Sequence, residues 1–559
     1  MPELLHPGVY TLEVSSGVRP IEGVSTSTAA FIGIADKGPI PGTILPTGRA
    51  AQPVMVTSLT DYTRQFGGFR RDSFLTYAVR SFYENGGRRL YIVRVASGAS
   101  IARVPVSSPP VSPPATSLPI VAANEGEWGN NIWLATDDSS DGDTTNNFKL
   151  LVMFGKTVEE ARANIVETYD NVTFRSAVVT NPIPSNYVRT LVNSRSEFIA
   201  FPVVPTPPVE VTARPANTTR DTSGRLLPTR LAGGSDGVTS TVNFVGAPAT
   251  DSTRTGTGIH GLDKLTDVNL IAIPGRGDSA TVNAGMAYCK NQRILQDCFY
   301  IADVGFVDDV NGARIDGAQP QGVITVADAR TFALPVAAIP LDKAAGDYGA
   351  IYYPWVRAGD PIGSGRNPLI LLPPSGFIAG IYARIDNSRG VFKAPAGTEA
   401  GVSGALSVAT TVSDTEQDQL NPIMVNVIRT VPTSGIVVWG ARTIGSNAEW
   451  RYIPVRRMAI FLRVSIYYGI QWAVFEPNDE PLWASLRLNI RAFMLTQFRA
   501  GAFQGSKPDD AFFVKCDSTT TTQQDIDNGV VNILVGFAPL KPAEFVVLKL
   551  SQKVNQPTA

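Results

Sequence analysis

The chain has 559 residues, of which 43% are hydrophobic and 17% charged, and its formal net charge is −1. This length predicts about three or four domains, and the apolar content is sufficient for large cores. Proteins that neutralise nucleic-acid phosphates need a basic surplus, so the charge balance argues against that class. The chain has three cysteines, Cys289, Cys298 and Cys516. A small, odd number of cysteines does not predict a disulfide framework.

We expect neither a targeting segment nor a membrane segment in this sequence. The N-terminus has neither a basic start nor an apolar run, so it does not read as a signal peptide. The most apolar long stretch, Met458 to Phe475, is interrupted by Arg463 and Gln471 and falls short of the ~20 apolar residues that cross a bilayer. We expect a soluble protein that is made in a cytoplasm and does not insert into a membrane.

Residues 24–95 alternate short apolar runs with amphipathic segments. The capping-box sequence beginning at Ser58 and the later Gly67 predict the start and end of a first helix. Phe74, Ala78 and Phe82 recur every fourth residue, which predicts a second helix with one apolar face. Strands are expected around these helices at Ala30–Ile34, Pro53–Val56 and Leu90–Val95.

The same alternation returns later in the chain, where we expect a strand at Val268–Ile273, a helix at Ser279–Leu295 and a strand at Cys298–Ile301. Residues 24–95 and 260–400 therefore predict one α/β layer. Between them, 101–120 contains six prolines and 201–237 is rich in Pro, Thr, Arg and Gly. We interpret the intervening segment as a separate β-rich lobe bounded by stiff linkers.

The C-terminal region carries the strongest helical pattern. Asp479 and Pro481 predict the start of a helix over 481–500, which Gly501 ends. The spacing of apolar residues from Val455 to Ile466 predicts another helix. Two strands follow, at Val530–Phe537 and Phe545–Leu550.

Candidate catalytic and metal-binding residues are sparse. The two histidines, His6 and His260, lie in a predicted arm and a predicted loop, so a histidine-based triad is not indicated. Gly256 to Gly261 fits the pattern G-x-G-x-x-G. Because a strand follows this segment instead of preceding it, a flexible connector is the better interpretation.

Asp137 to Asp143 resembles a calcium loop, but its twelfth position is Phe148, so a solvated hairpin tip is favoured. Arg276-Gly277-Asp278 is best explained by Asp278 or Ser279 acting as a helix cap.

Many unusual segments occur in a fixed order along the chain. They include His6-Pro7-Gly8-Val9-Tyr10 near the start, Phe82 to Val95, and the block from Asn421 to Leu550 with GIVVWGARTIGSNAEWRYIPVRR and GAFQGSKPDDAFFVKCD. These segments closely resemble the contractile tail sheath proteins of phages and of related injection machines. The resemblance covers roughly 1–100 and 260–550 and omits about 101–240, which we interpret as an insertion.

The resemblance implies an α+β, multidomain fold. Its discontinuous α/β core domains would be built from N- and C-terminal segments, with an inserted β-rich outer lobe and an extended arm at each end. The expected divisions are an N-terminal arm (1–23), a middle α/β domain in two parts (24–100 and 238–405), the inserted lobe (101–237), a C-terminal sheath core facing the inner tube (406–538) and a C-terminal arm (539–559).

The resemblance also implies a structural role without catalysis, cofactor or metal. Such a subunit polymerises into a helical tube of stacked, six-fold rings around an inner tube protein. It binds baseplate and terminal cap proteins but no nucleic acid, and it contracts to drive the inner tube through a target envelope. Assembly would take place in a bacterial or host cytoplasm, and the product would be a virion tail or a contractile injection particle. Two alternatives remain open, an α/β nucleotide-binding enzyme and another phage tail structural component.

Exchanged strands link subunits in the family, which implies that arms of two neighbours add to a sheet in a third subunit. The candidate residues for this exchange are Val9, Tyr10, Leu12, Val14, Phe545, Val546, Val547 and Leu548. Pro539 and Pro542 lack backbone donors and predict a hinge before the C-terminal arm. Arg487, Arg491 and Arg499 lie opposite the apolar stripe of the 481–500 helix and are candidates for inner-tube contact; solvation or sheath–sheath ion pairs are equally open.

Overall fold

The computed structural model describes residues 20–104, 120–173, 185–203, 214–306, 325–334 and 339–545. The chain forms two compact units. The α/β unit contains Thr26–Arg389 and Ala394–Ile453, and the C-terminal unit contains Met1–Ser25, Gly390–Lys393 and Pro454–Ala559. Helices and sheets are both abundant, in agreement with the predicted α+β class.

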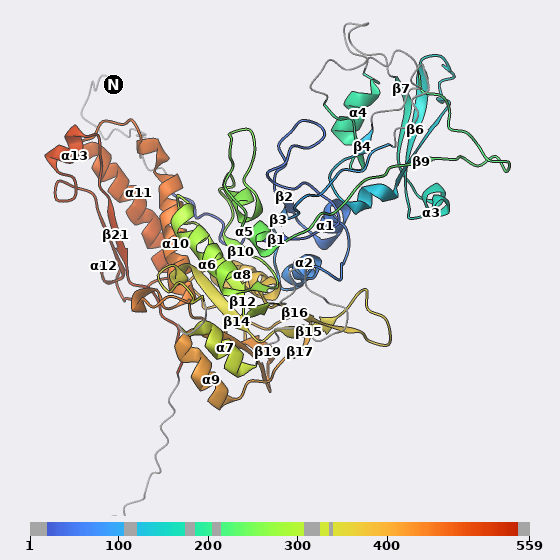
Figure 1. Ribbon diagram of the computed structural model, residues 1–559. Helices are drawn as coiled ribbons and strands as arrows, with labels where there is room; N and C mark the ends of the chain where they lie inside the picture. The colour runs from blue at the N-terminus through green and yellow to red at the C-terminus, as the bar shows by residue number, and fades with distance from the viewer. Residues whose placement is uncertain are drawn as a thin grey trace, which may run out of the picture. The chain divides into compact units, whose positions relative to one another are not determined.

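An eight-stranded, mostly parallel sheet organises the α/β unit (Figure 1). Its order is β19-β18-β14-β12-β10-β1-β3-β2, so strands from the early and late parts of the chain lie in one sheet. The pairs from β3 through β1, β10, β12 and β14 to β18 are parallel, while β2 and β19 pair antiparallel at the two edges. The strands are β1 (Ala29–Gly33), β2 (Val54–Val56), β3 (Leu90–Arg94), β10 (Leu270–Ala272), β12 (Phe299–Asp303), β14 (Gly349–Tyr353), β18 (Val425–Val431) and β19 (Gly435–Val438).

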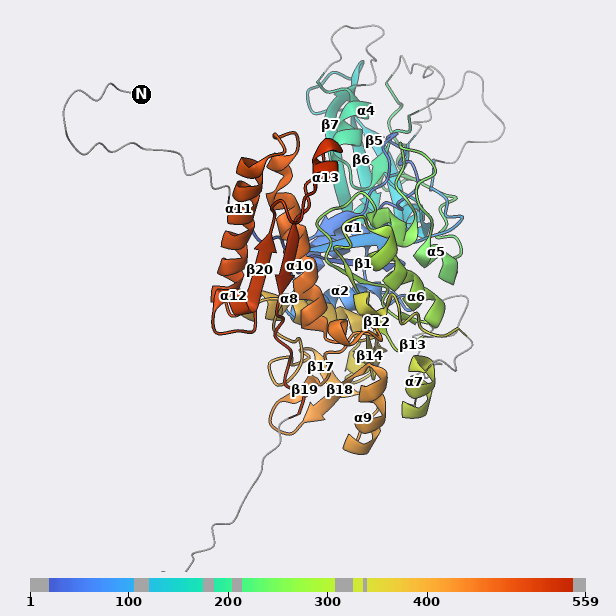
Figure 2. The ribbon, with the colours of Figure 1, turned by 90° about the vertical axis from the view of Figure 1, so that its left-hand side faces the viewer.

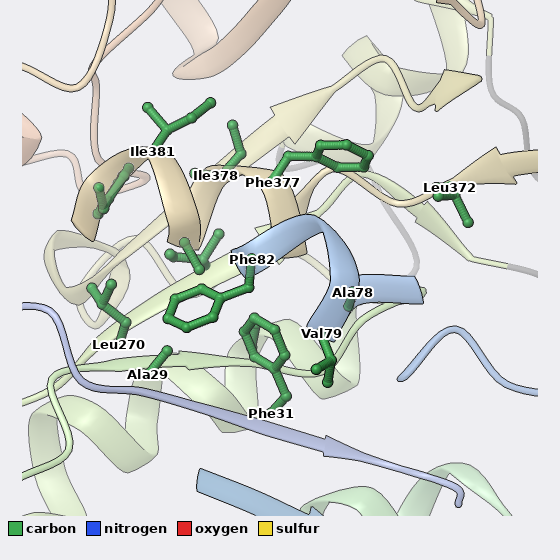
Figure 3. Packing of buried hydrophobic residues seen from close by; sticks show 14 of the residues in the cluster. Ala29, Phe31, Ala78, Val79, Phe82, Leu270, Leu372, Phe377, Ile378 and Ile381 are labelled. Carbon is green, nitrogen blue, oxygen red and sulfur yellow. The ribbon is translucent and has the colours of Figure 1, made fainter. Parts of the chain in front are cut away.

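Helices cover this sheet because their apolar faces match its buried strands. Figure 3 shows Phe82 of α2 (Leu75–Glu84) pointing at the sheet beside Ile378 and Ile381 of α8 (Ser375–Arg389). The rings of Phe82 and Phe31 meet edge to face with centroids 5.7 Å apart. The other helices of this unit's sheet region are α1 (Leu59–Phe66), α5 (Thr241–Val245), α6 (Ser279–Ala287), α7 (Val326–Ala333) and α9 (Asp414–Leu420).

Smaller sheets complete the region around the large sheet. A three-stranded antiparallel sheet has the order β16-β15-β17, and β11 pairs with β13. Their bounds are β11 (Arg276–Gly277), β13 (Gly305–Phe306), β15 (Val356–Gly359), β16 (Leu369–Leu372) and β17 (Ala405–Val408).

The inserted segment forms its own sheet and core within the α/β unit (Figure 1). Its sheet has the order β7-β6-β5-β9, and a second pair joins β4 to β8. The side chain of Thr157 caps α3, as the sequence predicts. The elements are β4 (Val121–Ala122), β5 (Ile132–Asp137), β6 (Asn147–Phe154), α3 (Val158–Ala163), β7 (Ile165–Thr173), α4 (Val188–Arg195), β8 (Ile199–Ala200) and β9 (Thr229–Arg230). We call this segment the lobe.

The C-terminal unit is built on two long helices (Figure 2), α10 (Ile453–Gly469) and α11 (Glu480–Arg499). Asp479 caps α11 through a hydrogen bond from Leu482 N, and Pro481 lies in its first turn, both as predicted. Met458, Leu462, Ile490, Phe493 and Met494 form the buried centre of this unit. The remaining elements are α12 (Pro508–Ala511), β20 (Phe512–Lys515), α13 (Gln523–Asp527) and β21 (Leu534–Phe537).

Three expectations need correction. The chain divides between Ile453 and Pro454 and not at 405/406, because β18 and β19 pair into the large sheet. Residues Gly258–Leu262 form a buried 3₁₀ turn and not a flexible connector. The helix predicted over Ser279–Leu295 ends earlier, since α6 passes into a π-helical turn at Tyr288–Gln292.

Candidate functional site

β20 and β21 form an antiparallel two-stranded sheet in the C-terminal unit, which we call the C-terminal ribbon. Phe512 is paired with Phe537 and Lys515 with Leu534. Across the described residues the ribbon has no third strand. A two-stranded sheet is marginal by itself, so its packing on helices matters.

The two faces of the ribbon differ. Phe512 is buried, and Val514, Val535 and Phe537 pack against the core cluster formed with α10 and α11. On the other face Phe513 is 46% exposed and Leu534 52% exposed. The ring of Phe513 covers Gly536, where an added Cβ would lie 2.2 Å from a ring carbon. The outer face therefore presents two exposed apolar side chains together with the exposed Lys515.

The edges of the ribbon carry backbone groups that the ribbon itself does not use. Ala538 N donates to Ala511 O at 2.8 Å. Hydrogen bonding alternates along an antiparallel pair, so the N–H and C=O groups of Val514, Val535 and Phe537 point outward. The N–H group of Phe512 fits this alternation, because it points away from β21 and donates to Pro508 O in α12. An outward row of donors and acceptors is a template for an added strand.

The predicted exchange residues fall mostly outside the described ranges. This applies to Val9, Tyr10, Leu12 and Val14 and to Val546, Val547 and Leu548. Phe545 is described and is 75% exposed. At the other end, Ile21 is buried in the core of the C-terminal unit, and Val24 N donates to Ser465 Oγ of α10 at 3.1 Å. Both terminal segments thus connect to the unit that carries the ribbon.

Backbone contacts hold one of the two predicted hinge residues, Pro539, in place. Ala538 O accepts a hydrogen bond from Gln504 N at 2.9 Å, and Pro539 forms a bridge with Phe503. Pro539 therefore belongs to the body of the unit. Bending of the exit segment is left to the residues from Leu540 onward, among which Pro542 stays a predicted hinge residue.

The three candidate arginines on α11 have different surroundings. Arg487 donates to Cys516 O at the end of β20 and to Glu480 at 2.9 Å. Arg491 pairs with Asp509 at 2.7 Å and lies over the ring of Phe512. Arg499 is exposed in the last turn of α11. Arg487 and Arg491 hold the ribbon and α12 of their own unit, which leaves Arg499 the most available for an external partner.

The other candidate chemistry is structural. His260 is 8% exposed and contacts Asp263 at 3.3 Å, and Asp278 caps α6 by accepting from Thr281 N. His6 lies outside the described residues. Burial raises the pKa of Cys289, Cys298 and Cys516, so these thiols stay protonated. Asp141 and Asp143 of the hairpin tip bind side chains and backbone of their own loop.

Within the described ranges, no three His, Cys, Asp or Glu side chains gather closely enough to hold a metal ion. In the same part of the chain, no helix has the length and apolarity that a bilayer crossing requires.

Sequence reasoning missed the outward-facing backbone groups of Val514 and Val535, because their direction depends on the pairing of strands about 20 residues apart. It also missed Arg94, which ends β3 and is 1% exposed. A charged residue in a strand that is otherwise apolar was the available signal, since a buried charge needs partners.

Comparison with known proteins identifies two family domains. Residues 259–444 match the phage tail sheath protein central domain, and 445–553 match the phage tail sheath C-terminal domain. A tail sheath protein of Vibrio phage KVP40 is 27% identical over 180 residues, 32% of this chain. A putative prophage major tail sheath protein of Pseudomonas aeruginosa strain UCBPP-PA14 is 24% identical over 183 residues, also 32% of this chain. The matched regions span 26% and 46% of those two relatives.

Solved structures show the same fold. The contracted sheath complex of the PVC extracellular contractile injection system superimposes with a TM-score of 0.53 at 21% identity, covering 99% of both chains. A sheath tail protein from Listeria innocua gives a TM-score of 0.55 at 12% identity, covering 93% of this chain and 96% of that one. The two family domains run without a gap over more than half of the chain. This chain therefore belongs to the phage tail sheath protein family.

Proposed function

We propose that the protein is the structural subunit of a contractile sheath, which polymerises around an inner tube protein and shortens to drive that tube through a target envelope. The observation that carries the proposal is the C-terminal ribbon. The N–H and C=O groups of Val514 and Val535 point outward and could pair with added strands. Both chain ends connect to the unit that carries this ribbon, so the same subunit supplies strands and accepts them.

Strand exchange suits a lattice that must change shape without dissociating. Each added backbone hydrogen bond contributes a net stabilisation of about 1 kcal/mol. A strand added at either edge would also place its side chains beside the exposed Phe513 or Leu534. These contacts survive a rotation of the subunit bodies if the arm bends beyond Pro539. Because the donor and acceptor faces differ, the contact does not close on itself and builds an open helix.

Contraction needs an energy source, and additional subunit contact can supply it. Burying a further ~500 Å² of apolar surface per subunit yields on the order of 10 kcal/mol before ordering costs, at ~25 cal/mol per Å². Summed over a long sheath, this supports mechanical work without nucleotide hydrolysis. No residue needs a catalytic role in such a machine.

The open crevice expected of a nucleotide-binding enzyme is filled in this sheet. Strand order reverses between β1 and β10, which is where such folds bind ligands. The cavity there is about 20 Å³ and is lined by Phe74, Phe244 and Arg276 among others. The Arg276 guanidinium lies over the Phe244 ring at 4.5 Å. Ligand sites usually measure about 300–1,000 Å³, so this comparison favours a structural role.

The partners follow from the same proposal. The subunit would bind itself in stacked rings, an inner tube protein, and baseplate and terminal cap proteins. A chain in the structure of the anti-feeding prophage baseplate has a similar fold. Rings of six subunits would match the six-fold symmetry of that baseplate structure. The assembled particle would be a phage tail or an injection particle, the two kinds of assembly in which similar proteins occur.

Electron microscopy of the purified protein tests the proposal directly. We expect hollow, striated cylinders in negative stain. Discrete particles that bind nucleotide would support the enzyme instead, and smooth narrow tubes would support an inner tube component. Either result would overturn the sheath assignment.

A further inference from the structure

Arg94 joins the large sheet to the lobe through buried hydrogen bonds. Its Nε donates to Ala35 O at 3.0 Å, and its Nη1 donates to Gly38 O and to Glu125 O, both at 2.8 Å. Nη2 donates to Asp36 O at 3.3 Å. Three of these carbonyls belong to the loop after β1, and Glu125 belongs to the lobe. A planar guanidinium can reach four carbonyls at once, which a lysine cannot do.

A second arginine extends this contact to the other end of the lobe. Arg70 Nη1 donates to Asp36 and to Asp236, both at 2.9 Å, and Arg70 also pairs with Asp72 at 2.7 Å. Asp236 accepts from Glu127 N at 2.9 Å and lies 3.9 Å from Arg94. The segments that enter and leave the lobe are thereby tied to the same two cations.

Lys37 adds a contact of another kind. Its ammonium lies 5.5 Å from the centre of the Trp128 ring and 4.9 Å from that of Phe198, both residues of the lobe. Burial lowers the pKa of Lys37. Its neighbour Gly38 donates from N to Asn124 Oδ1 at 2.8 Å. The loop 35–38 is therefore held by the lobe from two sides.

The connection itself is a paired ribbon. Ser100 and Ser235 exchange backbone hydrogen bonds at 2.9 and 3.1 Å, Arg103 and Ala232 do so at 2.8 Å, and Val238 N donates to Ser97 O at 2.9 Å. We call this pairing of 97–104 with 231–238 the neck. The boundaries predicted for the lobe, at 100/101 and 237/238, fall inside this neck, where the two segments are paired with each other.

We propose that the lobe and the eight-stranded sheet form one mechanical body, and that Arg94 is the positioning residue that fixes the lobe's orientation. In a contractile sheath the lobe would then rotate with its sheet and would not swing independently; this consequence rests on the proposed function. The joint itself does not, because every contact above lies within one subunit. Removing part of this set leaves buried polar groups without partners, which is costly.

The joint can be tested on the isolated full-length subunit by amide hydrogen exchange. The variants are Arg94→Met, which removes the donors, and Lys37→Met, which keeps the apolar stem between the two rings but removes the charge. Arg89→Met is the matched control, since Arg89 lies just before the same strand and makes an exposed ion pair with Asp267 at 2.5 Å. We expect the neck amides of Ser100, Arg103, Ala232 and Ser235 to exchange at least ~10-fold faster in Arg94→Met, a smaller rise in Lys37→Met, and no change in Arg89→Met.

The central strands β1, β10 and β12 distinguish positioning from general stability. Their exchange should stay unchanged in Arg94→Met. Neck exchange equal to that of the unmodified protein, or a uniform rise across sheet and lobe, would overturn the proposal. If Arg94→Met does not fold, Lys37→Met decides by the same criterion. Absence of cylinders in the unmodified protein would contradict the sheath function while leaving this exchange result standing.

Discussion

Asp303, at the end of β12, accepts hydrogen bonds from both the backbone N–H and the hydroxyl group of Ser375, at 2.7 and 2.8 Å, where α8 begins. Gly275 N donates to the same carboxylate at 3.0 Å. Asp303 is 1% exposed, and burial raises its pKa to about 6 although the three hydrogen bonds oppose that shift. The carboxyl group thus joins the end of β12 to the start of α8, and its burial favours the protonated, uncharged form.

The burial of Asp303 predicts a stability that falls as pH rises. The folded state binds the Asp303 proton more tightly than the unfolded chain does. The resulting contribution to the free energy of unfolding is complete below about pH 4 and is lost as pH rises through about 6. Relative to Asp303→Asn, which does not titrate, the free energy of unfolding should fall by about 2 kcal/mol between pH 4 and 7. Urea unfolding of both proteins at four pH values measures the difference. A constant difference, or one that grows with pH, would contradict the expected sign.

The outward backbone groups of the ribbon give a prediction for assembly. Val535→Pro removes an N–H that the ribbon does not use, so the subunit should fold while strand addition at this edge fails. Val514→Pro tests the opposite edge. Val535→Thr and Val514→Thr keep the N–H and serve as controls that should assemble normally. Circular dichroism monitors folding, and negative-stain microscopy counts cylinders. Normal cylinders from both proline variants would show that added strands do not use the ribbon.

The N-terminal segment should separate into a part for assembly and a part for folding. Deleting residues 1–16 should leave a folded subunit that does not polymerise. Deleting 1–24 should also destabilise the C-terminal unit, because it removes buried Ile21 and the Val24–Ser465 hydrogen bond. Loss of one buried isoleucine costs about 2–5 kcal/mol. Thermal unfolding and microscopy compare the two deletions, and cylinders of normal yield from the 1–16 deletion would refute the exchange role of this arm.

Local chemistry was sufficient to predict the elements whose ends it marks. Ser58 and Asp479 cap α1 and α11 as expected, and the apolar spacing predicted α10. The assignment of β18 to the large sheet was missed because Val425 pairs with Ile351, far away in sequence. The surroundings of Arg94 were missed for the same reason, since its acceptors lie near residues 36 and 125. Residue patterns reveal a buried charge but not which distant carbonyls receive it.

Arg499 provides a prediction about the inner tube. Arg499→Glu should leave the stability of the subunit within ~0.5 kcal/mol, because the side chain is exposed. If α11 faces the tube, the same change should weaken co-sedimentation with purified tube protein. Arg491→Glu is the comparison variant, since it breaks the exposed pair with Asp509, worth up to about 1 kcal/mol. Unchanged co-sedimentation of Arg499→Glu would place the tube contact elsewhere.

The exit of the C-terminal arm predicts how contraction can be blocked. Pro539 is fixed by its bridge to Phe503, so the bend between body and arm must lie between Leu540 and Ala543. Deleting Leu540 and Lys541 keeps that bridge and shortens the flexible segment. Contraction rotates bodies relative to donated strands, so the shortened arm should permit assembly and prevent the change of state.

The test uses assembled particles challenged with mild denaturant, scored by microscopy as long narrow or short wide cylinders. A variant with Leu540 and Lys541 both replaced by glycine keeps the length and should contract at least as readily as the unmodified protein. The deletion should leave the particles long and narrow under the same challenge. If the deletion contracts like the unmodified sheath, the hinge lies elsewhere or the last strand never leaves its own subunit. If the glycine variant fails as well, side-chain contacts of Leu540 and Lys541 would matter more than the length of the segment.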